Sequence, residues 1–532
     1  MECLEGMQGT KNDMEGNVKR YQAVAINAIA LLALAVPSHL AAWGQSPTTE
    51  NKRLHHHYKL VDMGTFGGLQ SYVPEGADIV SPKFLNIEGM LAGSADTSSL
   101  DPFFPDFCFT EDCLVTHAFL GKKSGKKDLG ALPGGASSET SWITDNGLIL
   151  GDSQNGETDP LIPGLPEKHA VLWQHGHITD LGTLGGGYQS ISMSVNSSAQ
   201  AVGFGTNGVA DPNSIIGLGY QTRAFFWQNG AMQDLGTLGS GTDAIAALIN
   251  ERGQVVGWSY TNSDPSDICA ETYNLPLTTG SFVWEDGKGM LDLGGLGGTC
   301  TIATSLNDRG QVVGASWLTG DAAQHAFRWD RKHGLIDLGT LGGDFSIAQA
   351  INNAGLAVGG SYMADNVQND AVLWKGSTML DLGTVDADAC SYAFAINELA
   401  QVVGVSGDTN CGSTRAFLWE RGGSMVDINA LVSSDSGIYV TYALAINDQG
   451  EIGGKGLLPN GDEHAVLLIP CDEHHPGVKG CDYSLVDTTA AALIQRPAAT
   501  ALPDVDTVPK HHSGSPRLRQ GVFHQHTRTS RP

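Results

Sequence analysis

The sequence is short of basic residues: 57 Asp and Glu stand against 30 Lys and Arg among 532 residues, for a formal net charge of -27. Nucleic acids and anionic lipid surfaces are bound chiefly through Lys and Arg, so neither is an expected partner of this chain. A negative surface favours cations or neutral ligands such as glycans.

The chain also lacks the short signatures of several enzyme classes. It has no Gly-x-Ser-x-Gly elbow, no His-Glu-x-x-His pair and no phosphate-binding loop. No two cysteines are spaced as Cys-x-x-Cys, so a zinc site is not expected. Without these signatures, catalysis is the weaker of the functional hypotheses below. No window repeats its apolar residues with the 3.6-residue period of a helix, so helices are not expected.

An export signal is predicted at residues 1–44. Lys19 and Arg20 precede an apolar run at 23–37, and small residues follow at 41–45. This order is typical of a signal peptide, and the run is shorter than the roughly 20 residues that span a bilayer. We therefore expect a secreted, extracellular or periplasmic protein without a membrane span once the signal is removed.

Eight cysteines follow the signal. An even number of cysteines in an exported chain favours disulfides, although connectivity is not fixed by sequence alone. Proximity along the chain suggests four pairs: Cys108–Cys113, Cys269–Cys300, Cys390–Cys411 and Cys471–Cys481.

Glycine is abundant, at 69 residues, and much of it belongs to one repeated phrase, Asp-Leu-Gly followed by a glycine-rich stretch. The phrase begins at Asp62, Asp128, Asp180, Asp234, Asp292, Asp337, Asp381 and Asp427. Between copies stand, in fixed order, an apolar stretch ending in Asn-x-x-Gly, a Val-Val-Gly segment, a variable loop and an aromatic segment ending in Trp. These short Val-, Phe- and Trp-rich segments bounded by Gly or Asn predict four antiparallel strands per unit.

Successive copies of the phrase begin 44 to 66 residues apart. Repeats of about this length with four strands each are typical of propeller blades. The first copy, at 58–68, precedes any complete unit, while the last unit stops at residue 470 without its Asp-Leu-Gly strand. The N-terminal strand would complete the last blade and leave no exposed sheet edge. We predict an all-β fold: an eight-bladed β-propeller over 58–470, with seven blades or a β-solenoid as alternatives.

Parts of the repeat have predicted structural roles. The recurring Trp is expected to pack between adjacent blades, the glycines to form sharp turns, and the Asp to accept hydrogen bonds from backbone amides. After the repeats, 471–487 is predicted to be a disulfide-closed loop and 488–532 a disordered tail. A short charged run follows the last strand, and we expect it to be exposed to solvent; the alternative is that it binds a metal ion. The run is Glu473, His474 and His475, with His464 nearby.

A family resemblance rests on three phrases together: His-Ala-Phe at 117–119 and 325–327, "DLGTLGG" after a Trp-ended strand, and "AIN" before a Val-Val-Gly segment. In this combination the chain resembles the HAF-repeat family of bacterial extracellular proteins over all eight units. The resemblance implies an exported bacterial β-repeat protein and no particular chemistry. The His is replaced in four units, so no shared role is implied for it; the replacements are Arg223, Gly280, Asp370 and Arg415.

The first four units carry long insertions between their second and third strands. They span 94–116, 152–168, 205–222 and 259–279. Each contains an Asp-Pro pair, and the four aspartates are Asp101, Asp159, Asp211 and Asp264. In an up-and-down blade these loops lie on the same face as the links between blades, which predicts a one-sided binding face and places both halves of Cys269–Cys300 and Cys390–Cys411 on that face.

Two kinds of ligand contact are predicted on this face. Together with the four aspartates, aromatic residues could stack on sugars; they are Phe103, Phe104, Phe107, Tyr220 and Tyr273. Acidic residues near Asp101 could hold calcium, which takes several oxygen ligands; they are Asp96, Asp106, Glu111 and Asp112. Solvated surface acids and loop anchors are the alternative reading of the same residues.

The resulting hypothesis is a non-catalytic binding or structural propeller, expected to be monomeric, with a polysaccharide or a cell-surface protein as partner. The alternative is a carbohydrate-active hydrolase or lyase with its site at the mouth of the central channel. Paired carboxylates about 5–9 Å apart would be required for that chemistry.

Overall fold

The computed structural model describes residues 54–487 except 75–78, 111, 387 and 410. The predicted signal at 1–44 and the predicted tail at 488–532 lie outside the described residues. Helical structure among them is limited to α1 (Asp267–Tyr273) and two 3-10 turns, η2 (Ile428–Ala430) and η3 (Ser434–Ser436). None of the helices found there is long and apolar enough to cross a membrane.

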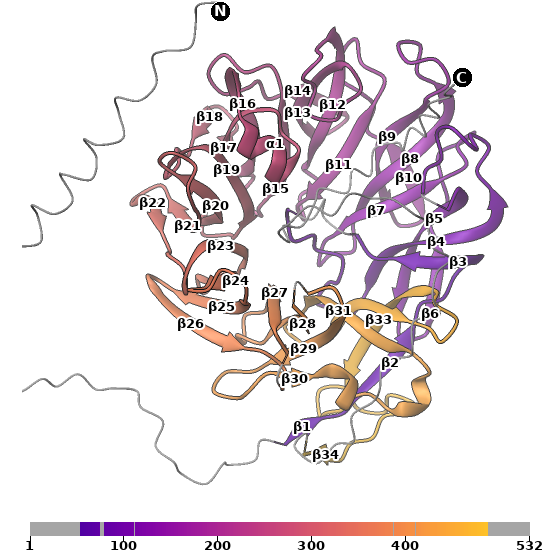
Figure 1. Ribbon diagram of the computed structural model, residues 1–532. Helices are drawn as coiled ribbons and strands as arrows, with labels where there is room; N and C mark the ends of the chain where they lie inside the picture. Colours follow the sequence, from indigo (N-terminus) through magenta and orange to yellow (C-terminus); the bar gives the residue numbers. More distant parts are fainter. Residues whose placement is uncertain (1–53, 75–78, 111, 387, 410, 488–532) are drawn as a thin grey trace, which may run out of the picture. The chain divides into compact units, whose positions relative to one another are not determined.

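The strands from β2 to β33 form eight blades of four antiparallel strands, and blades 1 to 7 follow chain order (Figure 1). Blade 1 consists of β3 (Gly67–Tyr72), β4 (Leu91–Leu100), β5 (Leu114–Lys122) and β6 (Gly125–Asp128), and blade 2 of β7 (Ser138–Ile143), β8 (Ile149–Thr158), β9 (Pro166–Gln174) and β10 (His177–Asp180). Blade 3 consists of β11 (Ser190–Val195), β12 (Ala201–Ala210), β13 (Tyr220–Gln228) and β14 (Ala231–Asp234). Blade 4 consists of β15 (Ala244–Ile249), β16 (Val255–Pro265), β17 (Leu277–Glu285) and β18 (Gly289–Asp292).

Blades 5 to 8 repeat the pattern with shorter second and third strands. Blade 5 consists of β19 (Gly297–Leu306), β20 (Val312–Leu318), β21 (Gln324–Asp330) and β22 (Gly334–Asp337), and blade 6 of β23 (Gly342–Ile351), β24 (Leu356–Met363), β25 (Asn369–Lys375) and β26 (Thr378–Gly383). Blade 7 consists of β27 (Cys390–Ile396), β28 (Val402–Gly407), β29 (Thr414–Trp419) and β30 (Val426–Asp427). Blade 8 consists of β31 (Tyr439–Ile446), β32 (Ile452–Leu457), β33 (Glu463–Pro470) and the N-terminal β2 (Tyr58–Asp62). Single parallel bridges join blades 4 to 7 into one 16-stranded sheet.

The ring is closed by its N-terminal strand. β2 pairs antiparallel with β33, in a register that runs from Tyr58 opposite Pro470 to Asp62 opposite Val466. In Figure 1 the indigo β2 accordingly lies beside the yellow β33. The predicted eight-bladed propeller and its closure are confirmed, and the alternatives of seven blades or a solenoid are wrong.

All four predicted disulfides are present, joining Cys108 to Cys113, Cys269 to Cys300, Cys390 to Cys411 and Cys471 to Cys481. The second and third each join a loop between the second and third strands of a blade to the start of an inner strand. Both halves therefore lie on one face of the ring, as the predicted strand order requires. The segment after Cys471 returns to the N-terminal end of the domain, where β34 (Leu485–Val486) pairs with β1 (His55–His56).

The Asp-Leu-Gly phrase forms the turn between blades. Asp337 Oδ1 accepts a hydrogen bond from Gly339 N at 2.7 Å, and Gly339 has a φ of +70°, where a side chain would be strained. All eight repeat aspartates accept a bond from the amide two residues later. The predicted hydrogen-bonding role of these aspartates is thereby confirmed.

The glycine of the Val-Val-Gly segment is explained by a bulge in the neighbouring inner strand. The register of β15 against β16 shifts between Ala246 and Leu248. A Cβ at Gly257, opposite this bulge, would lie 1.9 Å from the carbonyl oxygen of Ile245. Because no side chain fits so close to backbone, each unit keeps glycine there.

A ring of asparagines links the blades on the face opposite the long loops. Asn307 Nδ2 donates to Asn352 O at 2.9 Å, and Asn447 in blade 8 donates to Asn86 O in blade 1 at 2.9 Å. Equivalent bonds connect the other neighbouring blades. In blade 2, where Thr144 replaces the asparagine, Asn146 Nδ2 donates to Ser197 O at 2.9 Å instead.

The hydrophobic core is divided between neighbouring blades. Trp284 of blade 4 packs on Phe226 of blade 3, with ring centroids 5.2 Å apart, and Trp374 Nε1 donates to Leu338 O of the preceding blade. The predicted packing of Trp between blades is confirmed at these positions.

One feature of the core is absent from the repeat pattern: a segment of blade 1 that enters the centre of the ring. Ile79 and Val80 pack in a cluster with inner-strand residues of blades 3 to 5. Ser81 Oγ lies 3.3 Å from Gln349 O and 3.1 Å from Phe394 O, on blades 6 and 7.

Replacing Asn307 by alanine tests the asparagine ring. This side chain is buried, and its loss would remove the bond to Asn352 O of the next blade and leave the amides of Arg309 and Gln311 without their acceptor, so we expect a decrease of about 1–3 kcal/mol in the free energy of unfolding. Denaturant titration measures it. Asn460→Ala is the matched control, since the exposed Asn460 side chain contacts only Asp462, and equal losses in the two variants would contradict the role of the ring.

Candidate functional site

The long loops of blades 1 to 4 pack side by side. We call the described residues of 101–113, 159–165, 211–219 and 266–276 the collar. Tyr220 Oη, at the edge of the third loop, donates to Leu161 O of the second at 3.3 Å. The Phe107 ring of the first loop lies against Gly164 of the second. Ile216 and Leu275 join the third and fourth loops in one hydrophobic cluster. The collar is therefore a continuous structure on one face.

The Asp-Pro aspartates close the collar loops. Asp101, Asp159 and Asp211 are buried, and each Oδ1 accepts a bond from the amide two residues later at 2.8–2.9 Å. Their own amides bond across the loop to Cys113, Leu165 and Gly219. This differs from the predicted ligand contact, because their carboxylates face backbone amides rather than solvent. Asp264 is exposed.

The aromatic candidates divide by exposure. Phe104 has 54% of its surface exposed, whereas Phe103, Phe107 and Tyr220 are half-buried. Tyr273 is buried in the core, and its Oη donates to Gln324 Oε1 at 2.7 Å. The prediction that Tyr273 stacks on a sugar is therefore corrected: its ring anchors α1 to the next blade.

The calcium candidates are not gathered around a cation site. Among the described residues there is no group of three or more His, Cys, Asp or Glu that could hold a metal ion, and Glu111 lies outside them. Asp106 is exposed, and Asp112 Oδ1 accepts bonds from Thr110 Oγ1 and Leu114 N. His464, proposed as an alternative ligand beside His474, pairs instead with Asp62 at 2.8 Å.

Asp96 and Asp112 instead form a pair of carboxyl groups at the inner edge of the collar. Asp96 is buried, with Oδ1 accepting from Thr116 Oγ1 at 2.9 Å and Oδ2 from Tyr72 Oη at 3.2 Å. Burial, with the charge of Asp112 added, raises the pKa of Asp96 to about 7. Two adjacent carboxylates resist double ionisation, so this pair holds a proton near neutral pH.

A buried lysine lies in blade 2, under the first collar loop. Lys168 Nζ donates to Glu139 and lies 4.0 Å from Asp152 Oδ2 and 4.4 Å from the centre of the Phe109 ring, which the first collar loop places over it. Burial opposes the charge of Lys168, but Glu139 and Asp152 outweigh it and raise its pKa. Burial raises the pKa of Asp152 to about 7, against the attraction of Lys168.

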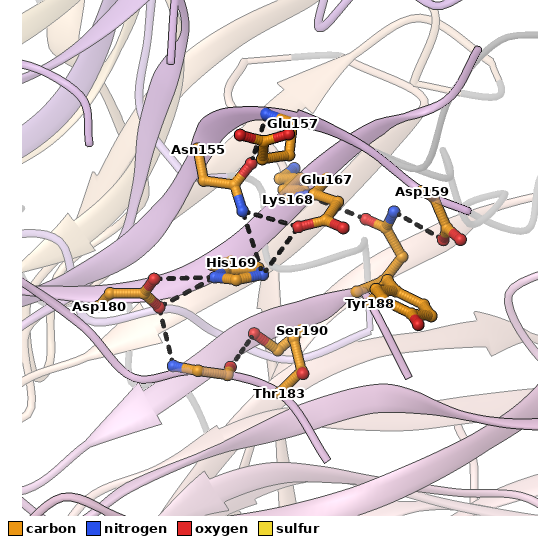
Figure 2. A network of polar contacts seen from close by, with 12 residues as sticks. Asn155, Glu157, Asp159, Glu167, Lys168, His169, Asp180, Thr183, Tyr188 and Ser190 are labelled. Atoms are coloured by element: carbon orange, nitrogen blue, oxygen red, sulfur yellow. Dashed lines mark hydrogen bonds and ion pairs between the residues drawn. The ribbon is translucent and has the colours of Figure 1, made fainter. Parts of the chain in front are cut away.

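The neighbouring residue, His169, lies between the carboxylates of Asp180 and Glu167, as Figure 2 shows. Its Nδ1 lies 2.9 Å from Asp180 Oδ2, and its Nε2 lies 3.7 Å from Glu167 Oε2. Asn155 Nδ2 donates to Glu167 Oε2 at 2.8 Å. Burial opposes the charge of Asp180, but the bonds from His169 and Gly182 lower its pKa.

The pair formed by the His position and the repeat Asp belongs to the scaffold. His117–Asp128, His325–Asp337 and His464–Asp62 repeat it, and arginine takes the place of histidine in Arg223–Asp234. Because the contact recurs on blades without a collar loop, it joins the third and fourth strands rather than marking a reaction centre.

Sequence reasoning missed Glu139, Asp152 and Lys168, but the repeat contained a signal. Glu139 occupies an inner-strand position where four other units have isoleucine: Ile191, Ile245, Ile302 and Ile347. Lys168 is the only cation at the position before the His. Departures from the repeat at positions that should be apolar or neutral identify the part of the ring where charge is concentrated.

The closed ring of eight blades makes the protein a β-propeller. No protein-family model matches the chain, and no curated protein matches its sequence. Among solved structures it is similar to the β-propeller domain of the Trilobed protease from Pyrococcus furiosus, at 11% identity and a TM-score of 0.36, covering 70% of this chain and 98% of that one.

It is also similar to a puromycin-hydrolyzing peptidase from Mycobacterium tuberculosis, at 11% identity and a TM-score of 0.40, covering 76% of this chain and 61% of that one. For TolB from Acinetobacter baumannii the identity is 12%, the TM-score 0.29 and the coverage 53% and 61%. The assignment as a propeller rests on the blades and their closure.

The raised pKa of Asp96 predicts a pH dependence of stability. An unfolded Asp titrates near 3.9, so the protonated carboxyl stabilises the fold fully below about pH 4, and this contribution is lost as pH rises through about 7. Asp96→Asn should reduce the fall in unfolding free energy between pH 5 and pH 8 by roughly 1–2 kcal/mol after solvent screening.

Denaturant titrations at the two pH values measure this difference. The control is Asp106→Asn, an exposed residue of the collar loop that follows the strand of Asp96, which should keep the wild-type pH dependence. An Asp96→Asn variant with that same dependence would contradict the assigned protonation.

Proposed function

We propose that this protein is an exported bacterial binding module whose collar holds a neutral polysaccharide. The observation that carries the proposal is the collar itself: four loops from successive blades, packed into one surface on one face, with an exposed aromatic ring at Phe104. Export is supported by the signal-like N-terminus, by four disulfides and by the resemblance to the HAF-repeat family.

The chemistry of the collar favours a sugar polymer over other partners. Aromatic faces with polar groups nearby suit the apolar and hydroxylated sides of a sugar ring, and Phe103 and Phe104 are consecutive residues of the first loop. The net charge of -27 opposes acidic polysaccharides. The Cys108–Cys113 disulfide and the contacts between loops fix the surface in advance, which reduces the entropy lost on binding.

A second candidate function, a glycan hydrolase or lyase, would use the Asp96–Asp112 pair, whose carboxyl groups interact directly and so lie closer together than the 5–9 Å of paired glycosidase carboxylates. A carboxyl group that titrates near neutral pH beside a second carboxylate has the properties of a general acid and its partner. Tyr72, which donates to Asp96, would be part of the same site. Reaction at this pair would take place at the inner edge of the collar.

Phe104→Ala tests the binding function. Retention of the whole chain on a panel of insoluble neutral polysaccharides should fall about 10-fold or more for this variant, because loss of a stacked ring costs on the order of 1–2 kcal/mol. Leu399→Ala is the control: Leu399 is 63% exposed but lies on the asparagine-ring face, so retention should be unchanged.

The same assay separates the other outcomes. If wild type is retained and Phe104→Ala is retained equally, the collar has no role in binding. If retention is lost in EDTA, binding depends on a metal ion. New reducing or unsaturated sugar ends that disappear in Asp96→Asn would establish the enzyme reading instead. Retention only on protein surfaces would replace the polysaccharide by a protein partner.

A further inference from the structure

Three equivalent residues join the collar loops of blades 1 to 3 to the blades that follow them. They are Ser137, Gln189 and Asp243, which stand directly before β7, β11 and β15. The carbonyl oxygen of each accepts a hydrogen bond from the second strand of its own blade at 3.0–3.1 Å, and the side chain of each accepts one from the third strand of the preceding blade. A difference between these side chains is therefore a difference in how each loop is held.

At the start of blade 3 this side chain is a carboxamide bonded to a carboxylate. Gln189 Oε1 accepts from Lys168 N at 3.0 Å, and Gln189 Nε2 donates to Asp159 Oδ2 of the second collar loop at 3.0 Å. Gln189 and Asp159 are both buried. Ser137 likewise supplies a hydrogen bond to Asp101 of the first loop. In both places an uncharged donor holds a buried Asp-Pro carboxylate.

At the start of blade 4 the same position has a second carboxyl group. Asp243 Oδ2 accepts from Thr222 N at 3.0 Å and from Ile215 N of the third collar loop at 2.9 Å. That loop carries Asp211 as its own Asp-Pro aspartate. Asp243 is 0% exposed, and its Oδ1 has no hydrogen-bond partner among the described residues. The atom that corresponds to the donor Nε2 of Gln189 is thus an oxygen, which can donate only when it carries a proton.

We propose that Asp243 and Asp211 share a proton that holds the third collar loop, 211–219, on blade 4, and that loss of this proton to solvent loosens the loop. With the proton on Oδ1, Asp243 would donate to Asp211 as Gln189 donates to Asp159. Without it, two buried carboxylates would repel each other and favour release of the loop. The third loop would then respond to pH while the second would not, whether or not the collar binds a sugar.

Asp243 is the group of this site that titrates. Burial, with the charge of Asp211 added, raises the pKa of Asp243 to about 6, although the bonds from the amides of Ile215 and Thr222 oppose the shift. Tyr260 lies opposite on β16 and is buried, with an Oη that has no partner in the described part of the chain. Burial, with the charges of the two aspartates added, raises the pKa of Tyr260, so its hydroxyl keeps its proton throughout this range.

A cation also lies beside the site, the guanidinium of Arg223 on β13. Its Nη1 donates to Thr242 O, next to Asp243, at 3.0 Å, and its Nε lies 3.0 Å from Asp234 Oδ2. A guanidinium does not titrate in proteins, and Asp234 already pairs with this one. Arg223 therefore adds no pH dependence of its own.

Hydrogen–deuterium exchange of the whole chain at pH 5.0 and pH 7.5, corrected for the intrinsic pH dependence of exchange, tests the shared proton. An Asp in a released loop titrates near 3.9, so the protonated carboxyl stabilises the held loop fully below about pH 4 and this contribution is lost as pH rises through about 6. The opening constant of amides in 211–219 should therefore rise about 10-fold between the two pH values. The second loop, 159–165, is the internal control for any general change in stability, and its opening should rise much less.

Two variants test the assignment from both sides. Asp243→Asn places an Nδ2 donor where Oδ1 stands, so the opening of 211–219 should no longer respond to pH beyond the change in the second loop. Gln189→Glu removes the uncharged donor of the second loop and should give 159–165 the pH response that wild type shows in the third. The proposal is overturned if the two loops of wild type respond alike, if Asp243→Asn keeps the wild-type response, or if Gln189→Glu leaves 159–165 unresponsive.

Discussion

No blade of this protein can be stable alone, because a four-stranded sheet leaves apolar side chains on both faces. Each blade covers one face of the next, so the first and last must also meet. The pairing of Tyr58–Asp62 with β33 provides that meeting, and the asparagine ring adds a bond between successive blades, including Asn447 to Asn86. The collar depends on this closure, because its four loops belong to neighbouring blades and contact one another.

The closed ring also explains how two unlike surfaces arise from one repeat. Turns between the first two strands are short and nearly invariant, since the Asn side chain and the following Gly must meet the next blade. Loops between the second and third strands are not held by this contact with the next blade, and the four loops of blades 1 to 4 are longer than the others. Three of these loops are closed in the same way, by a buried Asp such as Asp159 whose amide and carboxylate bond to the backbone of its own loop. Variation is thus confined to one face.

The sequence predicts the architecture well because the repeat states it eight times. The Asp-Leu-Gly turns, the unpaired first and last strands and the neighbouring cysteines are local signals, and each has a local structural cause. Burial of individual side chains is different. Asp101 and Tyr273 are residue types expected in ligand-binding loops, yet the Asp101 carboxylate is bonded inside its own loop and Tyr273 is bonded to Gln324 of the next blade. The pairing of Asp96 with Asp112, and of Lys168 with Glu139, brings together residues that are 16 and 29 positions apart within one blade, so it depends on how that blade folds and not on a local pattern.

The segment that enters the ring could have been found by counting. From the repeat Asp to the turn Asn there are 24 residues in blade 1, at Asp62 and Asn86, against 15 in blade 5, at Asp292 and Asn307. The extra residues carry Ile79 and Ser81 into the centre, where they contact inner strands on the far side. Because this segment occupies the centre of the ring, a polymer cannot pass through the ring from one face to the other. A chain-like ligand can therefore lie across one face, or insert one end into the central opening and withdraw from the same face.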